Sequence, residues 1–295
     1  MGWDAAIIAE AARSLPHTLR SIVLADEQAA ELSMLCGFDD DLAKQATATS
    51  NRIRGLLTQI HPALERVIGE HLDHPAIPEL LIKYPSPEKI RKAGQTRVAA
   101  LLTKHAPRAG KRWATEIFTA LGEQTVIVSG TSAAGIVLAQ LAAILKQLRT
   151  ARDELLIQVE ALVEAHPLHQ VLTSMPAVGV RTAARIITEV AGKEFQSSGH
   201  LASYAGLAPV TWRSGTSIRG DHPSRKGNKT LKRTFFLSAF AALKDPLSRA
   251  YYDKKRAEGK RHNQALIALA RRRCDVLFAM LRDGTFYEAP EPKNA

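Results

Sequence analysis

The sequence predicts a mainly α-helical protein, and three observations carry that prediction. Two long segments, about 26–60 and 131–165, repeat apolar residues three and four positions apart, as one face of a helix requires. Between them, Pro and Gly residues separate several shorter helical patterns. Apolar residues make up 45% of the 295 positions and charged residues 23%, a composition typical of a folded globular chain.

Residues 1–25 begin with a short amphipathic helix. Asp4 can cap this helix, small and apolar side chains follow on one face, and Pro16 ends it. A helix this short, with no strand before it, has little to pack against.

Residues 26–165 contain two long helices and a helical insertion. The first long helix ends near Pro62, and short helices fill the insertion at about 75–130. In 131–165 the apolar residues follow the heptad spacing of a coiled coil, which only Arg152 interrupts. The two long helices could pair as an antiparallel hairpin within the chain or as a zipper between chains, and the sequence leaves both open.

The charge of the chain indicates a polyanionic partner, with nucleic acid as the first candidate. The formal net charge is +11 and the pI about 9.8. Residues 205–275 hold 17 Lys or Arg and 5 acids, a net +12, so the rest of the chain sums to about −1. The sequence therefore predicts a basic C-terminal module attached to a nearly neutral remainder.

A cytoplasmic protein without membrane contact is expected. No stretch reads as long and apolar enough to span a bilayer, and an acid stands near the N-terminus, where a signal peptide has cations. The two isolated cysteines, Cys36 and Cys274, suit a reducing compartment.

Residues 169–190 read as a helix-hairpin-helix element. A short helix at about 169–174 is followed by a tight turn at 176–179 and a second helix at 181–190. Gly179 would let backbone N–H groups and a helix N-terminus approach a DNA phosphate. A glycine in such a turn is also common in α-helical proteins of other functions.

Ser214 lies in a segment, 206–227, that is rich in Gly and Pro and reads as mostly irregular. Arg213 and Arg219 flank the serine, and guanidinium groups bind phosphate oxygens well. No neighbouring residue is an obvious base, and His222 is the nearest candidate. Local chemistry alone favours a serine that binds phosphate over a nucleophile.

Three motifs together resemble one known family. They are "LTSMPAVGVRTAARIITEVAG", "LASYAGLAPVTWRSGTSIRG" and "SRKGNKTLKRTFFLSA". In this order they look like the C-terminal transposase domain of the insertion-sequence-110 family, the DEDD recombinases guided by a bridge RNA. The resemblance covers about residues 165–285.

The resemblance implies specific roles. In this family four acids of an N-terminal RuvC-like α/β domain hold Mg²⁺, and a C-terminal serine attacks DNA and becomes covalently linked to it. The "SG" motif makes Ser214 the expected nucleophile, and Asp4 matches the last of the four acids and is the expected metal ligand. The expected nucleic-acid contacts are Gly179, Arg213, Gly215, Arg219, Arg225, Lys226, Asn228, Lys229 and Arg233.

The resemblance also implies domains and partners. Residues 1–25 would be a remnant of the RuvC-like domain, 26–165 the coiled-coil region and 166–295 the transposase domain. The partners would be DNA at the element ends and target, a structured guide RNA, and further copies that form a dimer or tetramer through the coiled coil. The protein would associate with the bacterial nucleoid.

Only one of the four family acids has a match in this sequence. The chain therefore looks like a truncated or mis-started copy, and we expect it to bind nucleic acid with recombination impaired or lost. The alternative is a non-catalytic DNA- or RNA-binding coiled-coil protein derived from a transposase.

Overall fold

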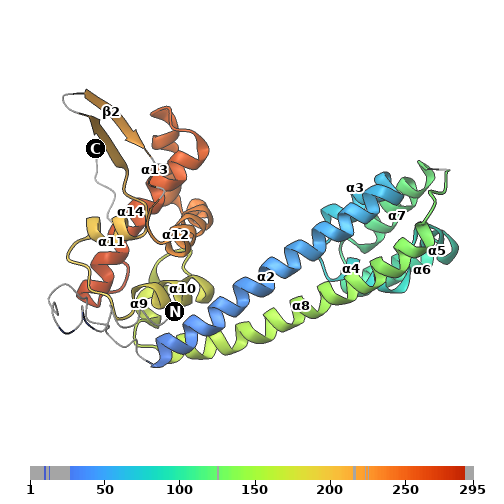
Figure 1. Cartoon of the computed structure of the whole chain (residues 1–295), viewed down its shortest axis with the longest axis horizontal. Coiled ribbons are helices and arrows are strands. Elements are labelled where there is room, and N and C mark those ends of the chain that lie inside the picture. Colours follow the sequence, from blue (N-terminus) through green and yellow to red (C-terminus); the bar gives the residue numbers. More distant parts are fainter. Residues whose placement is uncertain are drawn as a thin grey trace. The chain divides into compact units, whose positions relative to one another are not determined.

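The protein is mainly α-helical, as predicted (Figure 1). The computed structural model describes Glu10, Arg13 and residues 27–124, 126–214, 217–222, 224 and 226–289. The chain divides into two compact units. Unit 1 comprises residues 1–34 and 159–295, and unit 2 comprises residues 35–158. Asp4 and most of the predicted N-terminal helix lie outside the described residues.

Unit 2 contains most of the two long helices and the helical insertion between them. The long helices are α2 (Glu27–Ile60) and α8 (Thr131–Ala165), which confirms both predicted segments to within one residue. The insertion consists of α3 (Pro62–Glu70), α4 (Ala76–Lys83), α5 (Pro87–Ala93), α6 (Gln95–His105) and α7 (Gly110–Gly122). One apolar core joins these helices to the end of α2 and the beginning of α8.

The two long helices pair within the chain in an antiparallel direction. Ile53 and Leu57 near the end of α2 share the core with Leu138 near the beginning of α8. Farther along, Arg152 of α8 donates through Nε and Nη2 to the two carboxylate oxygens of Asp39 of α2, at 2.7 and 3.3 Å. The residue that interrupts the heptad pattern therefore has a partner on the facing helix. A zipper between chains stays a prediction.

Helix α8 corrects one expectation. By length and composition it could cross a membrane, because its 35 residues include a window of mean hydropathy 1.4. The same helix buries Leu138, Leu141 and Leu145 in the core of unit 2. Packing inside this unit therefore explains part of its apolar character, whereas Ile136 and Ile157 stay exposed.

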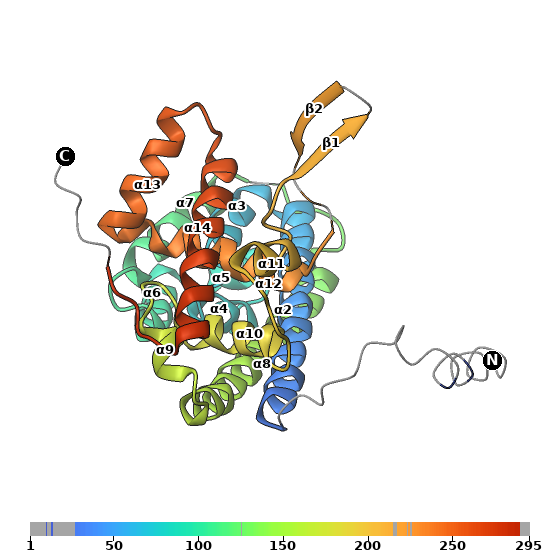
Figure 2. The same ribbon diagram turned by 90° about the vertical axis from the view of Figure 1, so that its left-hand side faces the viewer.

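Unit 1 is a helical assembly from which one β-hairpin projects (Figures 1 and 2). After the end of α8, this unit contains three short helices, α9 (His169–Ser174), α10 (Val180–Val190) and α11 (Ser198–Tyr204). The hairpin is formed by β1 (Val210–Ser214) and β2 (Ser217–His222). After it come α12 (Lys229–Ala241), a 3₁₀ turn (Ala242–Lys244), α13 (Pro246–Ala257) and α14 (His262–Asp283).

Helix α12 packs between two other helices of unit 1. It contacts α10 and α14, and it buries Leu231, Phe235 and Ala239, while Phe236 is half-buried. Asn228 caps its first turn by accepting from the backbone N–H of Leu231 at 2.9 Å. This capped, buried helix follows directly after the segment that contains Ser214.

The prediction that residues 206–227 are mostly irregular is wrong for the middle of this segment. Residues 210–214 and 217–222 pair as antiparallel strands, with an irregular register between Thr211 and Arg213. Of the described Gly and Pro residues in this segment, Gly206, Pro209 and Gly227 lie outside the strands, and Gly220 lies within β2.

Candidate nucleic-acid interface

Two glycines close the base of the hairpin by packing backbone against backbone. Gly206 has φ +64° and Gly227 has φ +97°, both in the left-handed region. A Cβ on Gly227 would lie 2.7 Å from the backbone N of Gly206, and a Cβ on Gly206 would lie 2.6 Å from the carbonyl oxygen of Lys226. Only glycine fits at either position, so the "YAG" and "KGN" motifs form one structural unit.

Asn228 fastens this base to the surrounding helices. Its backbone N–H donates to the carbonyl oxygen of Tyr204 at 2.7 Å. Its side-chain Nδ2 donates to Glu189 Oε2 of α10 and, at 3.1 Å, to Tyr204 Oη. Since Oδ1 caps α12, both the oxygen and the nitrogen of the Asn228 side-chain amide form hydrogen bonds within the fold. Its expected contact with nucleic acid stays a prediction beside this structural role.

The hairpin register places Ser214 next to the turn. Ser214 pairs with Ser217, whereas Val210 pairs with His222 at the other end. Four residues of strand separate these two rungs, a distance of about 14 Å along the strand. His222 and Ser214 therefore lie at opposite ends of the hairpin, which argues against His222 of the same hairpin as the base for Ser214.

Exposed cations lie at the base of the hairpin and on the first turns of α12. Lys226, Lys229 and Arg233 are exposed, and among the described residues none of the three forms an ion pair. Lys229 and Arg233 are four residues apart and share one face of α12. Such cations are available for phosphate oxygens.

The remaining predicted contacts are placed only in part. The backbone of Arg213 lies in β1 and that of Arg219 in β2. Gly215 and Arg225 lie outside the described residues. Arg213 and Ser214 occupy neighbouring rungs, opposite Ile218 and Ser217, whereas Arg219 follows Ile218 in the irregular part of the register.

The turn between α9 and α10 leaves Gly179 free of crowding. Gly179 is the N-cap residue of α10 with φ −90°, no side chain caps this helix, and a Cβ at Gly179 would meet nothing within 4 Å. The residue in the left-handed region is Ala177, with φ 60°. Neither crowding nor backbone conformation requires a glycine at 179, so the space beside it is open to a ligand.

A buried arginine, Arg273, forms a hydrogen bond to the backbone of this turn. Arg273 of α14 donates through Nη2 to the carbonyl oxygen of Pro176 at 2.5 Å and to Ser238 Oγ of α12 at 2.7 Å. Ser238 Oγ in turn donates to the carbonyl oxygen of Ala177 at 3.3 Å. Both predicted phosphate-binding motifs are therefore fixed to α12, one through Asn228 and the other through Ser238.

Burial lowers the pKa of Arg273 to about 10. The residue is 4% exposed, and its guanidinium group still carries its charge at neutral pH. Arg273 stabilises the fold, because its guanidinium N–H groups donate to the carbonyl oxygen of Pro176 and to Ser238 Oγ.

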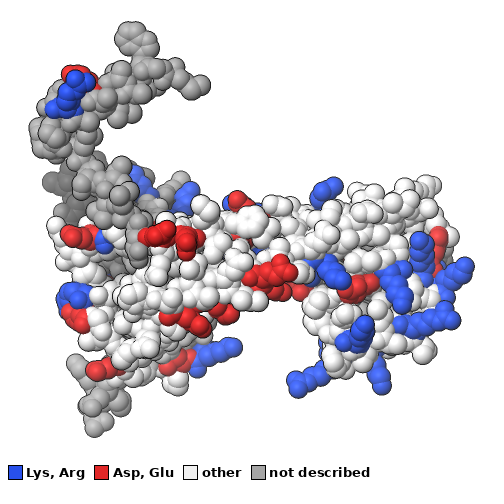
Figure 3. Space-filling model, turned by 90° about the horizontal axis from the view of Figure 1, so that it is seen from below, with Lys and Arg blue, Asp and Glu red and all other residues white. Residues whose placement is uncertain are grey.

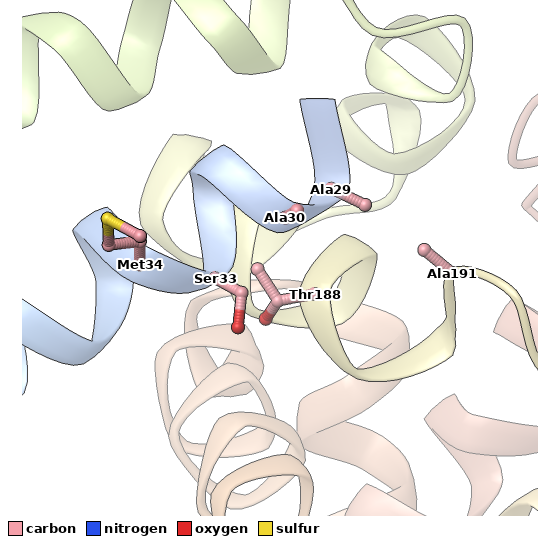
Figure 4. A pocket seen from close by; sticks show the side chains of 6 residues that line it. All are labelled: Ala29, Ala30, Ser33, Met34, Thr188 and Ala191. Carbon is pink, nitrogen blue, oxygen red and sulfur yellow. The ribbon is translucent and has the colours of Figure 1, made fainter. Parts of the chain in front are cut away.

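An open groove elsewhere in unit 1 does not suit phosphate. It has a volume of about 470 Å³ and is lined by Ala29, Ala30, Ser33, Met34, Thr188 and Ala191 (Figure 4). None of these side chains is charged. Among the described residues, no group of three or more His, Cys, Asp or Glu could hold a metal ion.

Comparison with known proteins decides the family. A family model described as "Transposase IS116/IS110/IS902 family" matches residues 169–253, and a second model described as "Transposase" matches residues 3–62. An uncharacterized 43.6 kDa protein of insertion element IS110 from Streptomyces coelicolor is 59% identical over 98% of this chain and 72% of its own length. The chain belongs to the IS116/IS110/IS902 family of transposases.

Two further relatives extend the comparison of this transposase. An uncharacterized 42 kDa protein of insertion element IS900 from Mycobacterium paratuberculosis is 38% identical over 96% of this chain and 71% of its own length. The pilin gene-inverting protein of Moraxella bovis is 31% identical over 38% of this chain and 36% of its own length. Membership of the family implies DNA as a partner and suggests a soluble cytoplasmic protein.

Sequence reasoning missed the residues that support the interface. Glu189, Ser238 and Arg273 hold the motifs of this transposase in place, but they lie far from them in the chain. One signal could have found Arg273: it stands in the apolar pattern of α14, between the buried Ala270 and Cys274. A charged residue at a buried helical position needs partners.

Proposed function

We propose that this transposase moves DNA through a serine nucleophile, Ser214. The observation that carries the proposal is the position of Ser214 beside the turn of a hairpin whose base is locked by Gly206 and Gly227. A fixed base keeps the entropic cost of positioning the serine low. Exposed Lys226, Lys229 and Arg233 at that base would hold the DNA backbone.

The proposed step exchanges one phosphoester bond for another. Ser214 Oγ bonds to phosphorus, and the bond from phosphorus to a deoxyribose oxygen breaks. The serine proton leaves to solvent, and the released oxygen gains a proton. Arg213 and Arg219 would stabilise the charge on the phosphoryl oxygens. Because the energy of the phosphoester is kept, a later attack by a DNA hydroxyl can rejoin strands without a cofactor that supplies energy.

The proposal includes Mg²⁺ only as an ion that Asp4 would bind, as the family resemblance implies. The described residues do not fit a metal site, and Asp4 lies outside them. No step above is therefore derived through a metal ion. In the family, bound Mg²⁺ would help to neutralise charge at the phosphodiester.

We also propose a structured guide RNA and self-association as partners. The basic character of residues 205–275 suits RNA phosphates as well as DNA phosphates. For self-association, the support is the apolar surface of the long helices within unit 2, where Phe38, Ile136 and Ile157 are 54%, 68% and 66% exposed. Association with the nucleoid would follow from DNA binding.

The second candidate is a DNA- or RNA-binding protein that performs no catalysis. The observation that favours it is the position of His222, the nearest candidate base in the sequence, at the far end of the hairpin from Ser214. Under this alternative, the serine only hydrogen-bonds to phosphate.

Trapping a covalent protein–DNA adduct distinguishes the two candidates. A nicked DNA substrate that carries the element end releases a short strand after attack, so even slow attack accumulates as adduct. We expect an adduct with the unmodified chain and with Ser217→Ala, but none with Ser214→Ala. Ser217 is the matched control because it pairs with Ser214 across the hairpin. Equal DNA binding by all three proteins without any adduct would establish the second candidate.

Complete strand exchange is a separate question for these 295 residues. The resemblance matches only Asp4 to the four family acids, so we propose that strand exchange with guide RNA, donor and target DNA is weak. Efficient recombinant product from this chain would refute that part of the proposal while leaving the role of Ser214 to the adduct experiment.

A further inference from the structure

The helical insertion of unit 2 carries a second concentration of positive charge. Residues 83–112 hold nine Lys or Arg residues and one acid, Glu88, a net +8 within 30 positions. They cover α5, α6 and the first residues of α7. Figure 3 shows Lys and Arg side chains gathered over this end of unit 2. The nearly neutral sum outside residues 205–275 conceals this segment.

Most of these cations are free to meet a partner. All nine are exposed. Among the described residues, Lys89, Lys92, Arg97, Lys104, Arg108 and Lys111 form no ion pair. Some cations elsewhere in unit 2 do form ion pairs: Lys44 pairs with Asp41, and Lys146 pairs with Glu79. The charge of the insertion is therefore not neutralised by the fold.

The helices that carry these cations are packed tightly. A Cβ on Gly110, at the beginning of α7, would lie 2.4 Å from the backbone N of Thr103 in α6. Gln95 of α6 donates to Thr115 Oγ1 of α7 at 3.0 Å. On α6, Arg97 and Lys104 are seven residues apart and share one side of the helix. The charged residues therefore lie on helices that are already ordered, so binding a partner costs little conformational entropy of the backbone.

The chemistry of the surface fits a polyanion better than a protein. Protein interfaces usually have an apolar or aromatic centre. Among the described residues of 83–112, no large apolar side chain is exposed. Unpaired cations spread over three helices instead match phosphates spaced along a nucleic-acid backbone.

We propose that α5–α7 form a second DNA-binding surface, built entirely from unit 2, that holds the phosphate backbone of duplex DNA without reading its sequence. The class of partner follows from family membership and does not depend on attack by Ser214. Lysines dominate the unpaired set, and as point charges they bind phosphate without selecting a base. The surface would hold DNA beyond the segment engaged by the hairpin.

Binding of the full chain to a long DNA duplex as a function of salt tests this proposal. In the variant K104Q/R108Q/K111Q, three phosphate contacts are lost. We expect the slope of log K against log salt to become shallower by up to about 2.7, at about 0.9 for each contact, and the affinity at 0.1 M salt to fall about tenfold or more. The loss should be the same for DNA of unrelated sequence.

The matched control removes the same number of charges from paired positions. K44Q/R66Q/K146Q neutralises three exposed cations of unit 2 that each have a carboxylate partner, namely Asp41, Glu123 and Glu79. We expect a smaller change of slope than in the first variant. A second variant of the surface, K89Q/K92Q/R97Q, should repeat the effect if either triple substitution alters folding, which melting temperature and circular dichroism report.

Three results would overturn the proposal. The first is an unchanged salt slope and affinity in both surface variants. The second is an equal loss in the paired-charge control. The third is a loss confined to a double-stranded RNA hairpin, which would assign the surface to RNA instead of DNA. The salt slope reports the charges of α5–α7 and the covalent adduct reports Ser214, so failure of the serine proposal and failure of this one give different results.

Discussion

Gly227 is the residue on which the geometry of the hairpin depends most directly. Its φ of +97° is strained for other residues, and a Cβ would lie 2.8 Å from the carbonyl oxygen of Tyr204. We expect Gly227→Ala to lower the free energy of unfolding by about 3 kcal/mol, because strain and overlap add. Urea unfolding followed by circular dichroism measures the loss.

Gly179→Ala is the control for that substitution. A Cβ at Gly179 has open space and its φ is −90°, so the cost should stay below about 1 kcal/mol. Equal costs at the two glycines would contradict the close backbone packing at the base of the hairpin.

Cys274 should make stability depend on alkaline pH. Burial raises the pKa of its thiol from 9.0 to about 12. Because the folded pKa is the higher one, the thiol's contribution is complete below pH 9 and is lost as pH rises from 9 to 12. Over that window we expect the unfolding free energy of the unmodified chain to fall relative to Cys274→Ala by up to about 1.4 kcal/mol per pH unit.

Unfolding by urea at pH 8, 9 and 10 measures the difference between the two proteins. Groups that titrate equally in both cancel in that difference. A constant difference across these pH values would mean that the Cys274 thiol is accessible to hydroxide in the folded protein.

At the scale of elements, the pair between Asp39 and Arg152 joins α2 to α8. The side chains are 21% and 26% exposed, and hydrogen bonding to Asp39 raises the pKa of Arg152. In a double-mutant cycle of Asp39→Ala and Arg152→Ala, we expect a coupling energy of about 1–2 kcal/mol. The exposed pair of Lys44 and Asp41 should couple by less than about 0.5 kcal/mol. Equal coupling in both pairs would argue against a fixed α2–α8 contact in unit 2.

The long helices could be predicted from sequence because their signal is local. Apolar residues recur at three and four positions through α2 and α8, and Pro62 and Pro167 stand just beyond their ends. The strands could not be predicted in the same way. Val210–Ser214 is short, and its pairing with β2 is favoured by the contact of Gly206 with Gly227, which are distant in sequence.

The candidate-site residues that stand together in one motif could be predicted from the sequence. The residues that hold these motifs in place were missed, because they lie far from the motifs along the chain. Ser214, Lys229 and Arg233 stand in one recognisable stretch. Arg273 lies 97 residues from the carbonyl of Pro176 that it binds, so no local pattern connects the two. Asn228 was expected to contact nucleic acid, and its motif gave no indication that its amide links three helices.

At the scale of the whole molecule, the two units differ in how their charge is arranged. Unit 1 presents cations at the base of the hairpin that carries Ser214, the proposed nucleophile, whereas unit 2 presents them on packed helices. A net charge for the entire chain cannot separate these arrangements. Counting charge in windows of 30 residues does, because residues 83–112 then stand out at +8.

The attachment site of DNA on this transposase tests the central claim most directly. Trypsin cleaves after Arg213 and Arg219, so the trapped adduct should yield the hexapeptide "SGTSIR" carrying a nucleotide after nuclease treatment. Fragmentation in the mass spectrometer distinguishes its three hydroxyl residues. The account predicts the phosphodiester on Ser214; a nucleotide on Thr216, on Ser217 or on any other peptide would contradict it.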